Sequence, residues 1–265
     1  MTEVWGSAPQ RSEGQVRHVP GTPCWTSLLV HDLGATQEFY GGLFGWSYDN
    51  PGPCRLGPCV RAVLDGREVA GLGELPPDRR LPREWTTYLA SSDADVTAEW
   101  IRCSGGTVGV GPLATGDVGR LVLASDPAGA PFGVRQPHEP PAPTAPGVPG
   151  TAVWHELLTH DAAVAVKFYK ALFPYEVKPA GSVDSDRLTL HLDGRPVASV
   201  RGVGAAVRRP RWTTWFEVAD TDAAVRRAEE LGGRMLEPPQ DGPAGRTASV
   251  ADPEGAVLTL VRSPR

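Results

Sequence analysis

The chain has 265 residues, which suits one large domain or two domains of about 130 residues each. Its 26 basic and 31 acidic side chains give a formal charge of -5, so it lacks the basic surplus that neutralises phosphates, and we exclude nucleic acid as a partner. No stretch approaches the roughly 18 apolar residues of a membrane span, and the polar tail over residues 1–20 lacks the apolar core of a signal peptide. We therefore expect a cytoplasmic protein with no membrane contact.

The cysteines all lie in the first half of the chain, at spacings that match no zinc or redox motif. In a cytoplasmic protein such cysteines are typically reduced. We therefore expect structural thiols and no disulfide framework. The four residues are Cys24, Cys54, Cys59 and Cys103.

The first half of the chain predicts two successive strand-helix-strand-strand-strand units. Residues 24–30 are rich in aliphatic, aromatic and β-branched side chains, typical of a strand, and Asp32 can cap the helix that follows. Two further strands flank the tight turn at Asp65-Gly66. A strand over residues 85–90, a helix over 96–103 and a hairpin that turns at 126–129 form the second unit.

The second half repeats the first at a shift that drifts from 129 to 126 positions, as expected for duplicated modules that differ by single-residue deletions in loops. Between them, residues 136–150 hold six prolines, a stiff connector that cannot join a central strand. We therefore divide the chain into a first module over 21–136, a Pro-rich linker over 137–150 and a second module over 151–265. The recurring pairs are Trp25 and Trp154, Asp32 and Asp161, Phe39-Tyr40 and Phe168-Tyr169, Asp65-Gly66 and Asp193-Gly194, Trp85-Thr86-Thr87 and Trp212-Thr213-Thr214, and Asp126-Pro127 and Asp252-Pro253.

Three sequence features carry a family resemblance: the Asp-x6-Phe-Tyr helices at 32–40 and 161–169, the strand Trp-Phe-Glu-Val-Ala-Asp at 215–220 and the Asp-Pro-x-Gly hairpins. Together they resemble the vicinal-oxygen-chelate superfamily of glyoxalases, bleomycin-resistance proteins and extradiol dioxygenases, and most of all its two-module actinobacterial glyoxalase-like members. The resemblance implies an α+β fold of tandem βαβββ modules, four units in all. Each pair of units would form a curved mixed sheet around a cleft.

The resemblance also implies where a divalent metal would be held, because enzymes of this superfamily use His, Gln and Glu side chains on the inner face of the sheet. None of the six matching positions carries an imidazole, a carboxylate or an amide, the donors that such sites need. We therefore expect no metal and no cofactor in either cleft. The six positions are Trp25, Thr86 and Gly133 in the first module and Trp154, Thr213 and Thr259 in the second.

Strand alternation predicts which side chains line the second cleft, because residues two apart share one face of a strand. An unpaired carboxylate on an interior face costs several kcal/mol, so Glu156 and Glu217 require a partner. That partner is either Arg187 or His191 in a structural ion pair, or a ligand. The residues assigned to this cleft are Trp154, Glu156, Arg187, Thr189, His191, Thr213, Trp215, Glu217 and Thr259.

The first cleft follows from the same alternation, and it has no inward carboxylate because Ala90 stands where the second module has Glu217. Its indole, Trp25, either contacts a ligand or fills the cleft as core. His155 is expected to face away from the cleft, towards the helices. The residues assigned to the first cleft are Trp25, Ser27, Cys59, Arg61, Thr86 and Tyr88.

Two functions fit these residues. The first is a metal-independent protein that binds a small planar organic molecule, a secondary metabolite, between Trp154 and Trp215. The second is a metal-free enzyme acting on such a metabolite, in which a glutamate is the general base and a cationic side chain stabilises an oxyanion. The loss of the metal ligands favours binding.

In the enzyme hypothesis, the general base is Glu217 or Glu156, and the oxyanion is stabilised by His191 or Arg187. The predicted partner in both hypotheses is a small-molecule ligand. Because two fused modules can complete each other's sheets, we expect a monomer or a homodimer.

Overall fold

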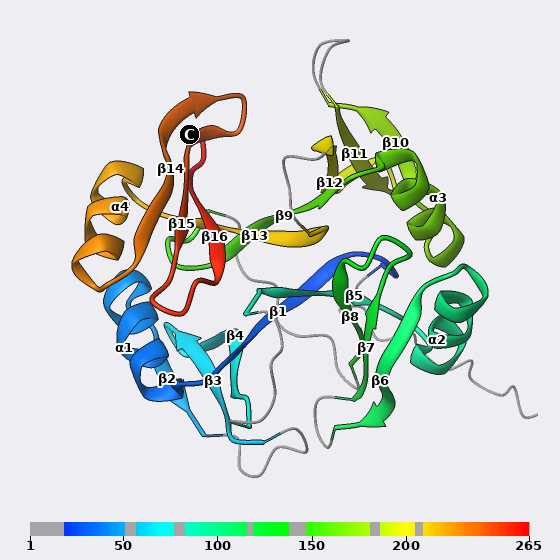
Figure 1. The fold of residues 1–265 in the computed structure, drawn as a ribbon, viewed down its shortest axis with the longest axis horizontal. Helices are drawn as coiled ribbons and strands as arrows, with labels where there is room; N and C mark the ends of the chain where they lie inside the picture. Colours follow the sequence, from blue (N-terminus) through cyan, green and yellow to red (C-terminus); the bar gives the residue numbers. More distant parts are fainter. Residues whose placement is uncertain are drawn as a thin grey trace, which may run out of the picture.

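The fold is given by a computed structural model, which describes residues 19–50, 57–76, 83–115, 119–137, 147–180, 186–204 and 209–264 (Figure 1). Each half of the chain builds one eight-stranded mixed sheet, which confirms the predicted α+β fold of tandem βαβββ modules. The bounds of the tail, the modules and the linker stay predictions, and residues 138–146 of the linker lie outside the described residues. No helix among the described residues is long and apolar enough to cross a membrane.

In the first sheet the strand order is β2-β3-β4-β1-β5-β8-β7-β6. The first strands of the two units, β1 and β5, pair antiparallel at its centre, and each also pairs in parallel with the last strand of its own unit. The elements are β1 (Pro23–Val30), α1 (Leu33–Phe44), β2 (Ser47–Asp49), β3 (Cys59–Leu64), β4 (Arg67–Glu74), β5 (Thr86–Ala90), α2 (Ala94–Cys103), β6 (Thr107–Ala114), β7 (Arg120–Ser125) and β8 (Pro131–Gln136).

The second sheet has the same plan, in the order β10-β11-β12-β9-β13-β16-β15-β14, with β9 and β13 at its centre. Its elements are β9 (Ala152–Thr159), α3 (Ala162–Leu172), β10 (Glu176–Pro179), β11 (Arg187–Leu192), β12 (Arg195–Gly202), β13 (Arg211–Glu217), α4 (Thr221–Glu230), β14 (Arg234–Gly242), β15 (Gly245–Ala251) and β16 (Val257–Arg262).

Local sequence signals explain where the elements begin and turn. Every α-helix follows an aspartate whose carboxylate accepts hydrogen bonds from backbone N–H groups of the first turn, which otherwise lack partners. At the predicted hairpin turn, Asp65 (φ 49) and Gly66 (φ 73) are both left-handed, the conformation that tight β-hairpins require. The matching residues Asp193 and Gly194 repeat this conformation in the second module.

The helices pair across the module boundary rather than within a module. Helix α1 lies beside α4, and α2 beside α3, on opposite sides of the molecule (Figure 1). Each of the two hydrophobic cores therefore contains side chains from both modules, such as Phe39 with Leu258 in one core and Phe168 with Phe132 in the other. Because the cores are shared, we expect the two modules to unfold together.

The modules also touch through the faces of their central strands that point away from the clefts. Thr26 Oγ1 lies 3.2 Å from Thr214 Oγ1, and Thr87 Oγ1 lies 2.9 Å from His155 Nδ1. The internal repeat relates these two contacts, with Thr26 in the place of His155. Burial lowers the pKa of His155 to about 4, so its imidazole is neutral at pH 7. His155 thus faces away from the cleft, as expected, and forms part of the module contact.

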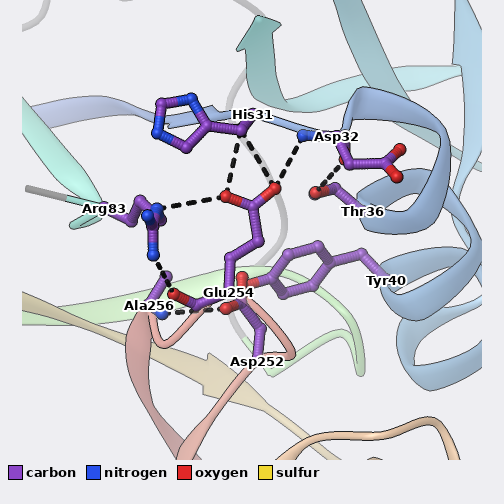
Figure 2. A network of polar contacts seen from close by, with 8 residues as sticks. All are labelled: His31, Asp32, Thr36, Tyr40, Arg83, Asp252, Glu254 and Ala256. Atoms are coloured by element: carbon purple, nitrogen blue, oxygen red, sulfur yellow. Dashed lines mark hydrogen bonds and ion pairs between the residues drawn. The ribbon is translucent and has the colours of Figure 1, made fainter. Parts of the chain in front are cut away.

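The recurring Phe-Tyr and Asp-Pro motifs meet across the boundary. The Tyr40 hydroxyl donates to Asp252 Oδ2 at 3.1 Å (Figure 2) and accepts a hydrogen bond from the Trp85 indole. Tyr169 accepts from the Trp212 indole in the same way. Burial raises the pKa of the Asp252 carboxyl group. These motifs, which carried the family resemblance, therefore hold the two modules together.

One carboxylate connects the two modules at only one of the two related module contacts. Glu254, in the turn between β15 and β16, accepts hydrogen bonds from the backbone N–H groups of His31 and Asp32 and forms an ion pair with Arg83 at 3.2 Å (Figure 2). The first module has Ala128 at the matching position. The pseudo-symmetry of the two module contacts is therefore incomplete.

The cysteine prediction is partly wrong. Cys24 and Cys103 are free thiols, but Cys59 is disulfide-bonded. Spacing alone could not show this, because a disulfide depends on the distance and direction of the two Cβ atoms. Cys54 lies outside the described residues.

Candidate functional site

The second module contains a cavity of about 290 Å³ on the cleft face of its sheet. This volume is near the lower end of small-molecule pockets, and an apolar wall with a few polar groups is typical of them. The wall draws on the central strands, on β11, β12 and β16, and on the β14–β15 turn. The lining residues are Val153, Trp154, Arg187, Thr189, Ser199, Trp215, Ala244, Val261 and Ser263.

A β-bulge shapes one wall of the cavity. Trp215 pairs with Trp154, but the next residue of β13 pairs with Ala152, so Val153 has no partner in the ladder. A bulge of this kind turns two consecutive side chains towards one side of the sheet. Both Val153 and Trp154 therefore line the cavity, which simple alternation does not predict.

A chain of hydrogen bonds fixes Trp154. Its indole Nε1 donates to Ser199 Oγ at 2.9 Å, and Ser199 Oγ donates to Glu156 Oε1 at 3.1 Å. An indole has one N–H group, so that of Trp154 is fully used within the protein. The ring is therefore held in one orientation and offers the cavity its apolar face.

Glu156 is a structural anion. Its side chain is only 2% exposed, and its carboxylate lies 2.7 Å from Arg187 Nε and 3.4 Å from Arg201 Nε. The nitrogens do not point at the oxygens well enough for hydrogen bonds, so these contacts are ion pairs. A carboxylate shared by two guanidinium groups and a hydroxyl is poorly suited to take a proton from a substrate.

Arg187 links this ion cluster to the cavity. Its guanidinium carbon lies 5.8 Å from the centroid of the Trp215 ring, within the range of cation–π attraction. Because Glu156 is buried behind it, Arg187 presents the cavity with a cation whose charge is offset in part by a carboxylate that Arg201 shares. It can bind a carbonyl oxygen without a large desolvation cost.

Two buried polar atoms in this region lack a partner. Trp215 Nε1 and Thr213 Oγ1 make no hydrogen bond in the structure, although their residues are only 7% and 5% exposed. Leaving a buried donor unpaired costs about 1–3 kcal/mol. Trp215 lines the cavity, so an oxygen of a bound molecule that reached this atom would satisfy the indole N–H.

The second predicted carboxylate, Glu217, also has hydrogen-bond partners within the protein. It is 5% exposed and accepts hydrogen bonds from both the backbone N–H and the hydroxyl of Ser263, at 3.0 and 2.6 Å. Ser263 stands between this carboxylate and the cavity, because Ser263 is part of the lining and Glu217 is not. The glutamate therefore positions the cavity wall.

The structure brings together only part of the predicted set in the second cleft. The predicted residues that line the cavity are Trp154, Arg187, Thr189 and Trp215, whereas Glu156, Glu217, Thr213 and Thr259 are buried and do not line it. His191 is half-buried outside the lining, and its Nδ1 lies 3.2 Å from the carbonyl oxygen of Thr189 in its own strand.

Several side chains on the cleft face of the first sheet pack on one another. The Tyr88 ring lies directly over Gly133, where a Cβ atom would come within 2.1 Å of it, and the Tyr88 hydroxyl lies 2.9 Å from Ser27 Oγ. The Trp25 ring is stacked under the guanidinium of Arg135 at 4.9 Å. Three of these residues were assigned to the cleft from the sequence, but they contact one another.

Two further residues predicted for the first cleft, Arg61 and Thr86, have partners within the sheet. Arg61 forms an ion pair with Glu68 of the adjacent strand, so its charge is balanced. Thr86 is half-buried and pairs with Ser27 in the antiparallel ladder between β1 and β5. Neither provides a free group for a ligand.

The residues at the family's metal positions do not suit a divalent ion. The Trp154 indole has no lone pair to offer and donates its proton to Ser199. The hydroxyl groups of Thr213 and Thr259 are weak donors compared with the imidazole and carboxylate groups that hold such ions. Across the described ranges, no group of three His, Cys, Asp or Glu side chains is arranged to hold a metal.

Sequence reasoning missed several cavity residues and one buried cation. Ser199, Val261 and Ser263 line the second cavity, and Arg135 lies in the first cleft. Ser199 could have been found, because strand pairing places it beside Glu156. Val261 and Arg135 occupy matching positions of the repeat. The presence of an apolar side chain in one module and a cation in the other is the sequence signal that could have drawn attention to both residues.

Fold and site together define a two-module glyoxalase-like protein whose second cleft is open and whose metal positions carry indole and hydroxyl side chains. Residues 153–261 match the model of the glyoxalase-like domain family. Over 262 residues the chain is 35% identical to the anthracycline biosynthesis protein DauV of Streptomyces sp. (strain C5), covering 92% of this chain and 94% of that protein. The chain therefore belongs to the glyoxalase-like family of the vicinal-oxygen-chelate superfamily, as the resemblance implied.

Two further comparisons agree. The chain is 32% identical over 266 residues to the putative glyoxylase CFP32 of Mycobacterium tuberculosis (strain CDC 1551 / Oshkosh), covering 96% of this chain and 98% of that protein. The fold is similar to the Mn(II)-bound glyoxalase from Novosphingobium aromaticivorans, with a TM-score of 0.65, 16% identity and coverage of 91% and 82% of the two chains. At that identity the likeness shows the fold alone.

Proposed function

We propose that the second module binds a planar aromatic molecule that carries a carbonyl oxygen, and that it does so without a metal. The observation that carries this proposal is Trp215, which lines a 290 Å³ cavity and whose buried indole N–H has no acceptor among the described residues. A carbonyl oxygen would accept this hydrogen bond, and the Trp154 and Trp215 rings would contact the planar framework. The name of the relative DauV supports a secondary metabolite as the ligand class.

The contacts of the two glutamates favour binding over catalysis. Glu156 is shared by two arginines, and Glu217 accepts two hydrogen bonds from Ser263, so neither carboxylate faces the cavity as a free base. The enzyme hypothesis requires one of them to take a proton from a molecule in the cavity, but neither glutamate lines that cavity. A metal-free binding protein, monomeric or homodimeric, is the function that the geometry supports best.

Calorimetric titration of the full chain with 1,8-dihydroxyanthraquinone in the presence of EDTA tests the proposal. Trp154→Ala should weaken binding by at least about tenfold, because it removes an aromatic wall. Trp215→Phe keeps an aromatic ring, although a smaller one, but loses the N–H, and should weaken binding by roughly two- to tenfold. The matched control is Trp25→Ala in the first module, which should leave the affinity unchanged.

Three outcomes would contradict the proposal: no binding by the wild type, binding only after Mn(II) replaces EDTA, or an equal loss in Trp25→Ala. A separate measurement addresses the enzyme hypothesis. Glu217→Gln should retain both fold and affinity. If Glu217→Gln instead abolishes conversion of the probe while affinity is kept, the protein is an enzyme.

A further inference from the structure

We propose that the first module holds a separate site for a small molecule bearing an oxyanion group, a carboxylate or a phosphate, and that this group binds Arg135. This site lies in β8 of the first sheet, away from the second-module cavity. The inference does not rest on the function proposed for that cavity, and either can fail without the other.

Arg135 is a buried cation that forms no ion pair with the residues that the structure describes. Its residue is only 8% exposed, and its Nε and Nη1 atoms are inaccessible to water and make no hydrogen bond. These two nitrogens carry three of the five N–H donors of a guanidinium. A buried charge is ordinarily paired, because an unpaired one costs several kcal/mol.

The guanidinium lies on the cleft side of the sheet. The neighbouring residues in β8, Phe132 and Val134, are core residues on the opposite face. Arg135 instead stacks on the ring of Trp25 at 4.9 Å. Cation–π contact stabilises the charge in part but satisfies none of its N–H groups.

The surroundings supply further donors and no free anion. The paired hydroxyls of Ser27 and Tyr88, 2.9 Å apart, share the cleft face, and each can donate to an oxyanion. Among the described residues no carboxylate forms an ion pair with Arg135, and Glu68, whose charge attracts this guanidinium, already pairs with Arg61, so two cations share one carboxylate.

The comparison of the modules indicates what is missing. Ala90 pairs with Arg135 in the first sheet, and Glu217 pairs with Val261 at the matching place in the second. The first module therefore has the cation without the carboxylate, and the second has the carboxylate without the cation. A ligand carboxylate or phosphate beside Ala90 would supply the anion that the second module carries in its own chain.

The experiment is calorimetric titration of the full chain with benzoate, with phenyl phosphate and with the neutral benzamide. At least one anion should bind and benzamide should not. Binding should weaken as salt is added. Which of the two anions binds decides between a carboxylate and a phosphate site.

Two variants locate the binding. Arg135→Val copies the second module, and Ala90→Glu supplies an internal carboxylate that competes with the ligand, so each should weaken binding at least tenfold. If Arg135→Val does not fold by circular dichroism, Ala90→Glu decides alone. Trp215→Phe, in the other cleft, should leave anion binding unchanged. Absence of binding by both anions, or binding that survives in folded Ala90→Glu, would overturn the proposal.

Discussion

The two modules share their framework but differ in what fills the cleft. In the first, Gly133 leaves room for the Tyr88 ring, and Arg135 stacks on the Trp25 ring. In the second, Thr259 and Val261 occupy the matching positions, and a cavity of about 290 Å³ remains. A few substitutions on the inner strands therefore change what a cleft of this fold contains, while the core motifs stay the same.

The shared motifs and the divergent residues have separate tasks. Tyr40 and Asp252 meet across the module boundary, and the indole donors Trp85 and Trp212 recur in both halves. These residues stabilise the association of the modules. The cleft residues take no part in these contacts, so they can differ between the modules without altering the contacts that join the modules.

The largest predicted effect concerns the module contact, where His155 stands in the place of Thr26. Its folded-state pKa of about 4 lies below the ordinary value of 6.5, so the unfolded chain binds the proton more readily. Stability from the neutral imidazole is present above pH 6.5 and is lost as the pH falls towards 4. The loss should reach about 3 kcal/mol, measured by urea denaturation at a series of pH values.

The control for this prediction is His155→Thr, which copies the other contact. Burial raises the pKa of Asp126 and Asp252, and such groups act in the opposite direction, losing stability as the pH rises. The difference between wild type and His155→Thr cancels their contribution. A difference that does not change between pH 7 and pH 4 would show that the imidazole is not buried in its neutral form.

The second prediction compares Glu156 with its counterpart Ser27. Glu156→Gln removes the charge shared by Arg187 and Arg201 and should destabilise the protein by about 2–3 kcal/mol, the lower end for a broken buried ion pair because both arginines remain partly exposed. Ser27→Ala should cost less than about 1.5 kcal/mol, since it loses one hydrogen bond. Denaturant midpoints measure both, and equal losses would refute the assignment of Glu156 as the centre of the ion cluster.

The sequence predicted the framework well because repetition, capping aspartates and Asp-Gly turns are local signals. It also placed Trp154 and Trp215 on the cleft face, which alternation determines. It could not predict the bulge at Val153, because register depends on the pairing of distant strands. Nor could it show that Glu217 is held by Ser263, a contact that forms only when β16 lies beside β13.

The metal positions illustrate a further limit. Residue types alone indicated that Gly133 cannot hold a metal. They did not show that the Tyr88 ring occupies the space that a side chain at position 133 would need. Burial of the Arg135 guanidinium was hidden for the same reason, since its packing on Trp25 joins residues from opposite ends of the module. Tertiary packing, rather than local pattern, decides what a cleft contains.

The third prediction tests whether the Tyr88 ring lies over Gly133 in the first cleft. Gly133→Ala would place a Cβ atom within 2.1 Å of the Tyr88 ring, so the ring must move and the protein should lose about 1–2 kcal/mol. Thr259→Ser at the matching position only removes a methyl group and should cost less than about 1 kcal/mol. If thermal unfolding shows no loss for Gly133→Ala, the Tyr88 ring does not occupy the place that the structure assigns to it.

The smallest effect, and the most direct test of the comparison, is Val261→Arg. The substitution places an arginine in the second cleft, at the position that matches Arg135 of the first. Glu217 pairs with this position in the sheet and can form an ion pair with the new guanidinium. The fold should therefore be retained, whereas affinity for 1,8-dihydroxyanthraquinone should fall at least about tenfold, equivalent to about 1.4 kcal/mol. The matched variant Arg135→Val should leave that affinity unchanged. If Val261→Arg binds the probe as tightly as the wild type, the ligand does not enter the cavity beside Val261, and the difference between the clefts is unrelated to binding.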